Sequence, residues 1–202
     1  QSLDANTTGA DNTAIGKGAL TSNTTASFNT AVGNDALRDV TTNTNNVAMG
    51  VNAALTSTGS YNTAIGNNTF RGTSNSGSNC TAIGYNSLNA NTTGSANVAV
   101  GAISLDANTT GQYNTAIGYE SLSANTTADE NTALGSFALR YNTTGGNNVA
   151  IGSYALDANT TANDNTAVGR AAGWNANRIY TSIKINGAGA NAIIGEQSAQ
   201  DS

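Results

Sequence analysis

A short phrase of the form Asn-Thr-Ala-Ile-Gly recurs along most of the chain. The glycine that ends it occurs at residues 16, 33, 50, 66, 84, 101, 118, 135, 152 and 169. The interval between successive glycines is constant, except for one step that is shorter by a single position and the next, which is longer by the same amount. A register that persists over this length indicates an array of stacked structural units, none of which could bury a core alone.

Within each unit, numbered here from the asparagine of the phrase, the residues alternate as they do in a strand. Position 2 is Thr or Val, position 3 is always Ala, and position 4 is a medium-sized apolar residue. Positions 2 and 4 therefore share one face, and their β-branched residues favour a strand. We expect position 4 and position 9, which is usually Leu, to fill the interior. The small side chain at position 3 would face a neighbouring chain.

The rest of the unit is typical of corners. Glycine at position 5 suits a positive φ or a close backbone approach, and the later stretch Ala-Asn-Thr-Thr-Gly suits a polar turn whose asparagines stack in ladders along the axis. Gly, Asn and Thr recur too densely for helices. The sequence therefore predicts an all-β parallel β-solenoid, or β-roll, of about ten turns, each of 17 residues.

The pattern changes near the C-terminus, which divides the chain into two parts. We expect residues 1–173 to form the solenoid array and residues 174–202 to form a capping or tip segment. Residues 178–185 alternate as a strand, and residues 191–195 repeat the phrase in altered form. A cap would cover the open edge of the last turn, which otherwise invites pairing with another chain.

The units from Asn12 to Gly169 resemble the repeats of trimeric autotransporter adhesin heads, although the units here are longer. That resemblance covers about four fifths of the chain and implies a left-handed β-roll assembled as a homotrimer. Units of this longer kind are also similar to those of bacteriophage tail fibres. An intertwined triple β-helix is a further alternative for how three chains would combine.

The two ends of the sequence give a further expectation. The chain begins with Gln1 and not with Met, so we expect it to be a piece of a longer protein. It ends at Ser202, which resembles the product of the self-cleaving C-terminal chaperones found on phage fibres, where the cut follows a serine. An arbitrary boundary at Ser202 is the alternative.

Composition excludes several classes of function. The net charge is −5 and no basic patch is present, so a nucleic acid partner is not expected. No apolar run approaches the ~20 residues needed to cross a bilayer, so we expect no membrane insertion. The chain has no His, which removes the usual Ser-His and Cys-His nucleophile pairs. With its carboxylates scattered, the protein is expected not to be an enzyme and to hold no metal or cofactor.

Aromatic side chains near the corners are the candidates for ligand contact, because they offer flat apolar area, with a polar tip in Tyr. The candidate site residues are Tyr85, Tyr113, Tyr119, Tyr154 and Trp174. The tyrosines could instead shield corners or pack between chains, and Trp174 could instead plug the cap. Cys80 replaces the asparagine of position 1 and is expected to be a packed small residue.

Three hypotheses for function follow. The first is a structural and receptor-binding segment of an extracellular trimeric fibre, on a cell surface or a virion, which attaches to a surface glycan or protein receptor. The second is an ice-binding solenoid with a file of Thr at position 2, although we expect that file to point inward. The third is a fibre spike that cleaves glycans, against which the dispersed carboxylates argue.

Overall fold

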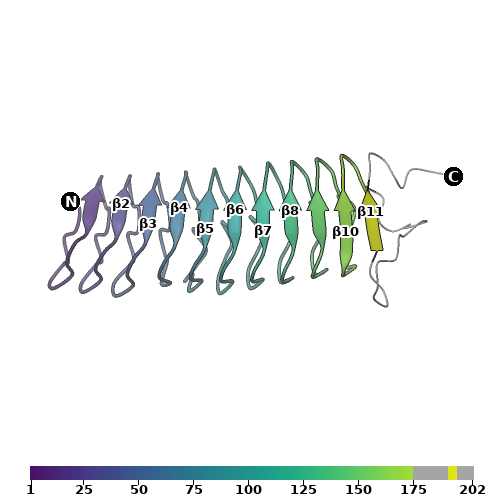
Figure 1. The fold of residues 1–202 in the computed structure, drawn as a ribbon. Helices are drawn as coiled ribbons and strands as arrows, with labels where there is room; N and C mark the ends of the chain where they lie inside the picture. Colours follow the sequence, from purple (N-terminus) through teal and green to yellow (C-terminus); the bar gives the residue numbers. More distant parts are fainter. Residues whose placement is uncertain (175–190, 195–202) are drawn as a thin grey trace.

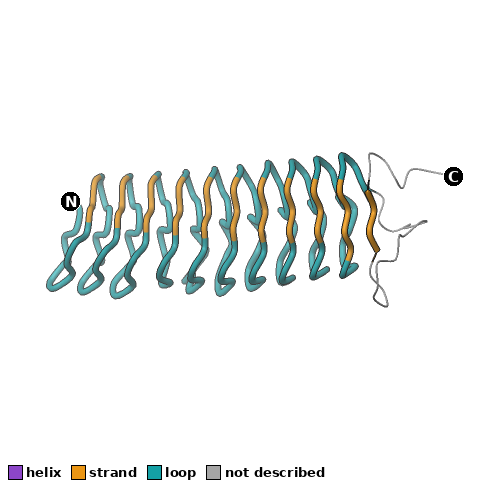
Figure 2. Tube along the Cα trace, in the orientation of Figure 1, coloured by secondary structure: helices purple, strands orange, loops and turns teal. Residues whose placement is uncertain are grey.

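The computed structural model describes residues 1–174 and 191–194. They form a rod in which eleven strands lie side by side in chain order and in parallel (Figure 1). The described chain consists of strands and connecting loops, without helices (Figure 2). The strands are β1 Thr13–Ile15, β2 Thr30–Val32, β3 Val47–Met49, β4 Thr63–Ile65, β5 Thr81–Ile83, β6 Val98–Val100, β7 Thr115–Ile117, β8 Thr132–Leu134, β9 Val149–Ile151, β10 Asn165–Val168 and β11 Asn191–Ile194.

The strands pair in the register that the repeat predicts. Ala14 is opposite Ala31 in the first pair, and the same positions face each other in every pair up to β10. The one shorter unit and the one longer unit keep this register because their differences in length are absorbed after the strands, between positions 9 and 17. The predicted all-β parallel solenoid is confirmed.

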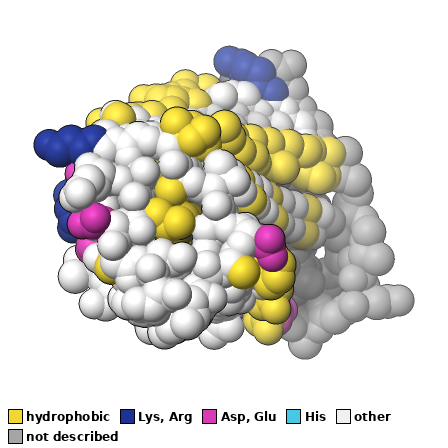
Figure 3. Space-filling view, turned by 90° about the vertical axis from the view of Figure 1, so that its left-hand side faces the viewer, with side chains coloured by type: hydrophobic (Ala, Val, Ile, Leu, Met, Phe, Trp, Pro, Cys, Tyr) yellow, Lys and Arg dark blue, Asp and Glu magenta, His cyan; other side chains and the backbone are white. Residues whose placement is uncertain are grey.

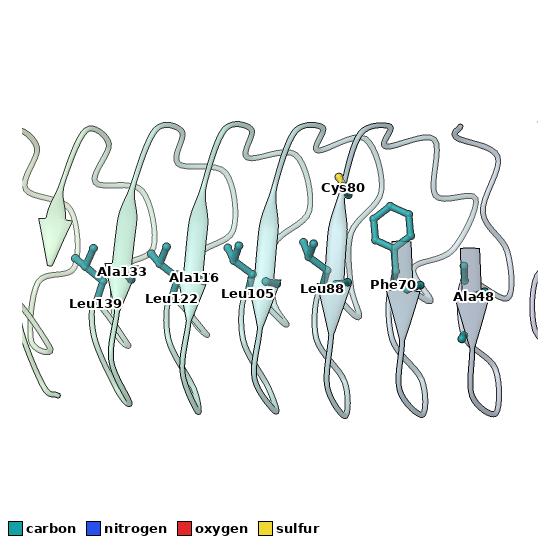
Figure 4. Packing of buried hydrophobic residues seen from close by; sticks show 14 of the residues in the cluster. Ala48, Phe70, Cys80, Leu88, Leu105, Ala116, Leu122, Ala133 and Leu139 are labelled. Carbon is teal, nitrogen blue, oxygen red and sulfur yellow. The ribbon is translucent and has the colours of Figure 1, made fainter. Parts of the chain in front are cut away.

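The interior of the rod is lined by position 3 and position 9. The alanines of position 3 are fully buried from Ala31 onward, and the leucines of position 9 are fully buried as well. Leu88, Leu105, Leu122 and Leu139 stack along the axis, with Phe70 continuing the file (Figure 4).

The expected orientation of the strands was therefore wrong. Position 3 points into the solenoid, and positions 2 and 4 point out to its surface, as the strand β4 shows with only Ala64 fully buried. The interior is already occupied by the leucine of position 9 and by buried asparagines, so only a methyl group fits beneath the strand. Alanine is required there by the core of a single chain.

Two ladders of buried asparagine run along the interior. In one, at position 12, the side-chain amide of Asn108 donates to the Oδ1 atom of Asn91 at 3.0 Å and to the carbonyl of Gly111 at 3.0 Å. In the other, at position 1, the Oδ1 atom of Asn97 accepts from the backbone N–H of Asn114 at 2.9 Å. Each ladder provides hydrogen-bond partners for buried backbone N–H and carbonyl groups of the corners. These groups would destabilise the fold if they were left unpaired. The predicted ladder at the Asn-Thr-Thr corner is confirmed.

Glycine at position 5 meets both conditions expected of it. Gly118 has a φ of 135°, and a Cβ atom added to it would lie 2.6 Å from the carbonyl carbon of Gly135 in the next turn. The backbones of successive turns thus approach too closely for any side chain at this corner.

Strand β11 extends the sheet beyond the ten repeat units. Its backbone pairs in parallel with β10, with Asn165 opposite Asn191 and Val168 opposite Ile194. The altered phrase at residues 191–194 therefore adds a further strand to the array. The strand expected at residues 178–185 and the terminal residue Ser202 lie outside the described residues.

Candidate functional site

The outward face of the sheet is one of two surfaces that could carry function. It is formed by positions 2 and 4 of every turn, and no charged residue occurs at either position. Rows of hydrophobic side chains run along the rod when it is viewed from its N-terminal end (Figure 3). The position 4 side chains that are more than a third exposed are Ile15, Met49, Ile117, Leu134 and Val168. We call positions 2 and 4 of strands β1 to β10 the sheet face.

The second surface is a cluster of aromatic residues at the corner that follows strands β7 to β10. The rings of Tyr119 and Phe137 meet edge to face with centroids 5.3 Å apart, and the rings of Phe137 and Tyr154 stack with centroids 4.8 Å apart. Trp174 lies further along the rod and is 49% exposed. We call these four residues the aromatic corner.

A buried carboxylate holds the side chains beside the aromatic corner in place. Asp157 is 3% exposed and accepts two hydrogen bonds of 3.0 Å from the guanidinium of Arg140 in the preceding turn. Its Oδ2 atom also accepts a hydrogen bond of 3.3 Å from the indole N–H of Trp174. Burial lowers the pKa of Arg140, but the hydrogen bonds and charge of Asp157 outweigh this and raise it overall.

Arg140 in turn connects this carboxylate to the rings. Its guanidinium lies 4.7 Å from the centroid of Phe137 and 4.3 Å from that of Tyr141, within the range of cation–π contacts. Further along the corner, a hydrogen bond to the Glu120 carboxylate raises the pKa of Tyr119. Charges and rings therefore alternate along this side of the rod.

The structure brings together some of the residues proposed from the sequence and separates others. Tyr119, Tyr154 and Trp174 all belong to the aromatic corner. Tyr85 occupies the same corner position as Tyr119 but lies two turns earlier, and it is 53% exposed. Tyr113 precedes β7 whereas Tyr119 follows it, so the strand separates these two residues.

Sequence reasoning missed Arg140 and the part that Asp157 plays with it. The signal was present in the repeat, because Arg140, Asp157 and Trp174 are each separated by one whole unit and so occupy position 10 of successive turns. Residues at one position of neighbouring turns become direct neighbours in a solenoid. Aligning the non-repetitive positions across turns would have grouped these three side chains.

The cysteine thiol and the remaining carboxylates of the described residues show no arrangement that points to catalysis or metal binding. Burial raises the pKa of the Cys80 thiol to about 11, so the thiolate form is disfavoured. Within residues 1–174 and 191–194, no group of three or more Cys, His, Asp or Glu residues could hold a metal ion. The described part of the chain also contains no helix that could span a membrane. Asp129, Glu130 and Asp164 line a shallow surface hollow, where Asp129 accepts a hydrogen bond from the backbone of Gln112.

Comparisons with known proteins add no assignment. No protein-family model, curated protein or solved structure matches the chain. Its function is therefore argued from its own residues and geometry.

Proposed function

We propose that the chain is the rod of a trimeric attachment fibre, of the phage-tail-fibre or bacterial surface adhesin kind. In this proposal three copies associate through their sheet faces outside the cell, and the rod presents a receptor-binding surface to a cell-surface ligand such as a glycan. The resemblance of the repeats to those of trimeric adhesin heads and tail fibres supports the same proposal.

The observation that carries the proposal is the sheet face. It runs through ten turns, bears no charge and carries an apolar side chain at position 4 of every turn, of which five are more than a third exposed and the others half-buried. Uncovered apolar patches of this extent are typical of interaction surfaces. A second copy fits better than an unrelated partner, because two faces with the same spacing of turns match each other along their whole length. Closed symmetry limits such association to a defined oligomer.

Sedimentation analysis of the full chain tests this proposal. The native protein is expected to sediment as a trimer, and the double variant Ile117→Lys, Leu134→Lys is expected to sediment as a monomer, because charge on the sheet face would be buried without a partner. The matched control is Thr110→Lys, Thr127→Lys, which adds the same charge at exposed corner positions of two adjacent turns and should remain trimeric. A native protein that sediments as a monomer would refute the proposal.

A second candidate, an ice-binding solenoid, is favoured by the observed orientation of position 2. The threonines were expected to point inward, but they lie on the outward sheet face in seven of the ten units: Thr13, Thr30, Thr63, Thr81, Thr115, Thr132 and Thr166. Strands in one sheet are ~4.8 Å apart, so these hydroxyl and methyl groups form a regular file. A trimer would cover this file. Thermal hysteresis of a monomeric protein would support ice binding, and its absence would exclude it.

A further inference from the structure

The aromatic corner holds rings at one position of two adjacent turns. Position 7 adopts a positive φ in each turn, and four of the earlier turns place Asn or Asp there: Asp35, Asn52, Asn68 and Asn86. Asn and Asp tolerate this conformation better than other residues with side chains. Phe137 and Tyr154 occupy the same position with φ of 64° and 61°. Other residues with side chains, such as Ile103 and Glu120, also adopt a positive φ at this position. The two adjacent turns are therefore set apart by their side chains, because both place an aromatic ring at this corner.

The rings are also held in place before any ligand arrives. Asp157 is buried and fixes both Arg140 and Trp174 through hydrogen bonds, and Arg140 packs over Phe137. The ring of Tyr154 is stacked on Phe137. A surface ordered in this way loses little conformational entropy on binding, which favours affinity.

A surface hollow completes the arrangement. It has a volume of about 270 Å³ and is lined by Tyr154, Arg170, Ala171 and Trp174. Pockets for drug-sized ligands begin at about 300 Å³, so this hollow suits a single six-membered ring. Two aromatic side chains at its border supply flat apolar area, and the phenol and indole polar atoms lie at their edges.

The charges of the corner select for an uncharged ligand. Arg140 is committed to Asp157 by a two-point ion pair. The two carboxylates, Glu120 and Asp157, balance the two guanidiniums, Arg140 and Arg170. The corner therefore offers little net attraction to an anion or a cation, whereas the stacked rings can bind an apolar face whatever its charge.

We infer that the aromatic corner is a carbohydrate-binding site, in which a neutral pyranose ring of a glycan lies in the hollow between Tyr154 and Trp174. Phe137 and Tyr119 extend the aromatic surface toward the preceding turns and would contact further sugar units of the chain. This inference rests on the proposed function, because it names the site and the class of ligand through which the fibre would attach.

Trp174 provides a direct readout, since it is the only tryptophan of the chain. We would titrate the full-length protein with the methyl glycosides of glucose, galactose and mannose, with cellobiose and lactose, and with the charged sugars glucuronic acid and N-acetylneuraminic acid. Tryptophan fluorescence and saturation-transfer NMR would report binding. At least one neutral sugar is expected to change both signals, with disaccharides binding more tightly than single sugars.

Variants then locate the site. Tyr154→Ala and Trp174→Ala are each expected to weaken binding about tenfold, which corresponds to about 1.4 kcal/mol, and Tyr154→Phe should retain it because the ring remains. NMR would be the readout for Trp174→Ala, because this variant has no tryptophan whose fluorescence could report binding. The matched control is Tyr85→Ala, an exposed tyrosine at an equivalent corner outside the aromatic corner, and it should bind within about twofold of the native protein.

The outcomes separate this inference from the proposed function. Binding of no neutral sugar, binding of charged sugars only, or binding that survives both alanine variants would overturn the inference, even if the protein is a trimer. A monomer that binds neutral sugars at the aromatic corner would overturn the fibre proposal and leave the sugar site standing. The oligomeric state is measured by sedimentation, independently of the sugar titration.

Discussion

At the scale of the residue, the buried asparagines contribute most to holding the turns together. Each one forms hydrogen bonds that link two neighbouring turns and a corner of its own turn. The position 12 ladder is interrupted between Asn23 and Asn75, where Val40 and Ser57 replace asparagine. The consequence is visible in the hydrogen bonds: the Oδ1 atom of Asn23 and the hydroxyl of Ser57, on either side of Val40, are buried without a partner. Single residues therefore determine where the stack is weakest.

Restoring the ladder should stabilise the protein. In Val40→Asn the new amide can donate to Asn23 and accept from Ser57, which would satisfy both buried groups. Each such group costs about 1–3 kcal/mol when unpaired, so we expect the free energy of unfolding to rise by about 1–2 kcal/mol in chemical denaturation. Val40→Leu is the control, since leucine has nearly the same shape as asparagine but no amide. An equal gain in Val40→Leu would show that packing, and not the ladder, is responsible.

A second residue should make stability depend on pH. Burial, together with the smaller effect of the Glu120 charge, raises the pKa of the Asp106 carboxyl to about 6. An aspartate in the unfolded chain titrates near ~4, so between these values the folded protein binds more protons than the unfolded chain. The contribution of Asp106 to the free energy of unfolding is therefore greatest below about pH 4, and falls as the pH rises to about 6.

Thermal unfolding across this pH range measures the effect. Asp106→Asn is expected to flatten the dependence between pH 4 and pH 6 and to leave the protein more stable than the native chain at pH 7. The control is Asp164→Asn, which removes an exposed carboxylate and should keep the native dependence. An unchanged slope in Asp106→Asn would show that Asp106 titrates normally in the folded protein.

At the scale of the element, the corner after each strand is defined by glycine. In Gly118→Ala the added methyl group would meet the backbone of Gly135 at 2.6 Å, and the φ of 135° is unfavourable for any L-residue with a side chain. We expect a loss of stability of about 2–4 kcal/mol, as for other strained backbone positions. Gly146→Ala is the matched control, because its nearest atom would be 3.3 Å away and its φ lies outside the positive range. Similar losses in the two variants would contradict this account.

The strands show both what the sequence predicted correctly and what it did not. The period, the strands, the glycine corner and the leucine file follow from the repeat, because every turn must present the same residues to its neighbours. A strand of three residues such as Thr115–Ile117 offers only two orientations, and hydrophobicity alone favoured the wrong one. The space beneath the strand is set by side chains from other corners, notably Asn114 and Leu122, and their arrangement in three dimensions is not given by alternation within the strand.

The aromatic corner shows the same limit. Tyr119, Tyr154 and Trp174 stood out as exposed aromatics near corners, which needs only their position in the unit. The role of Arg140 and Asp157 depends on contacts between turns, so it emerges only when residues one unit apart are compared. Features that lie within one unit can be inferred from the sequence of that unit. A site built from different residues in successive turns becomes visible only when the stacking of the turns is known.

At the scale of the whole molecule, stability should depend on register more than on length, because each turn contacts only the turns before and after it. Deleting residues 97–113 removes one complete unit and joins Ala96 to Asn114, which restores the phrase and both asparagine ladders. We expect this variant to give the β-rich circular dichroism of the native protein and to unfold in one cooperative transition, at a slightly lower temperature. Deleting residues 97–104 removes fewer residues but places Leu105 at position 1 and Asp106 where the strand should begin. The faces of all later turns would then be out of step, and the native spectrum should be lost. If the shorter deletion were tolerated and the longer one were not, the turns would not be acting as interchangeable layers, and the sheet face that the fibre proposal requires would not be continuous.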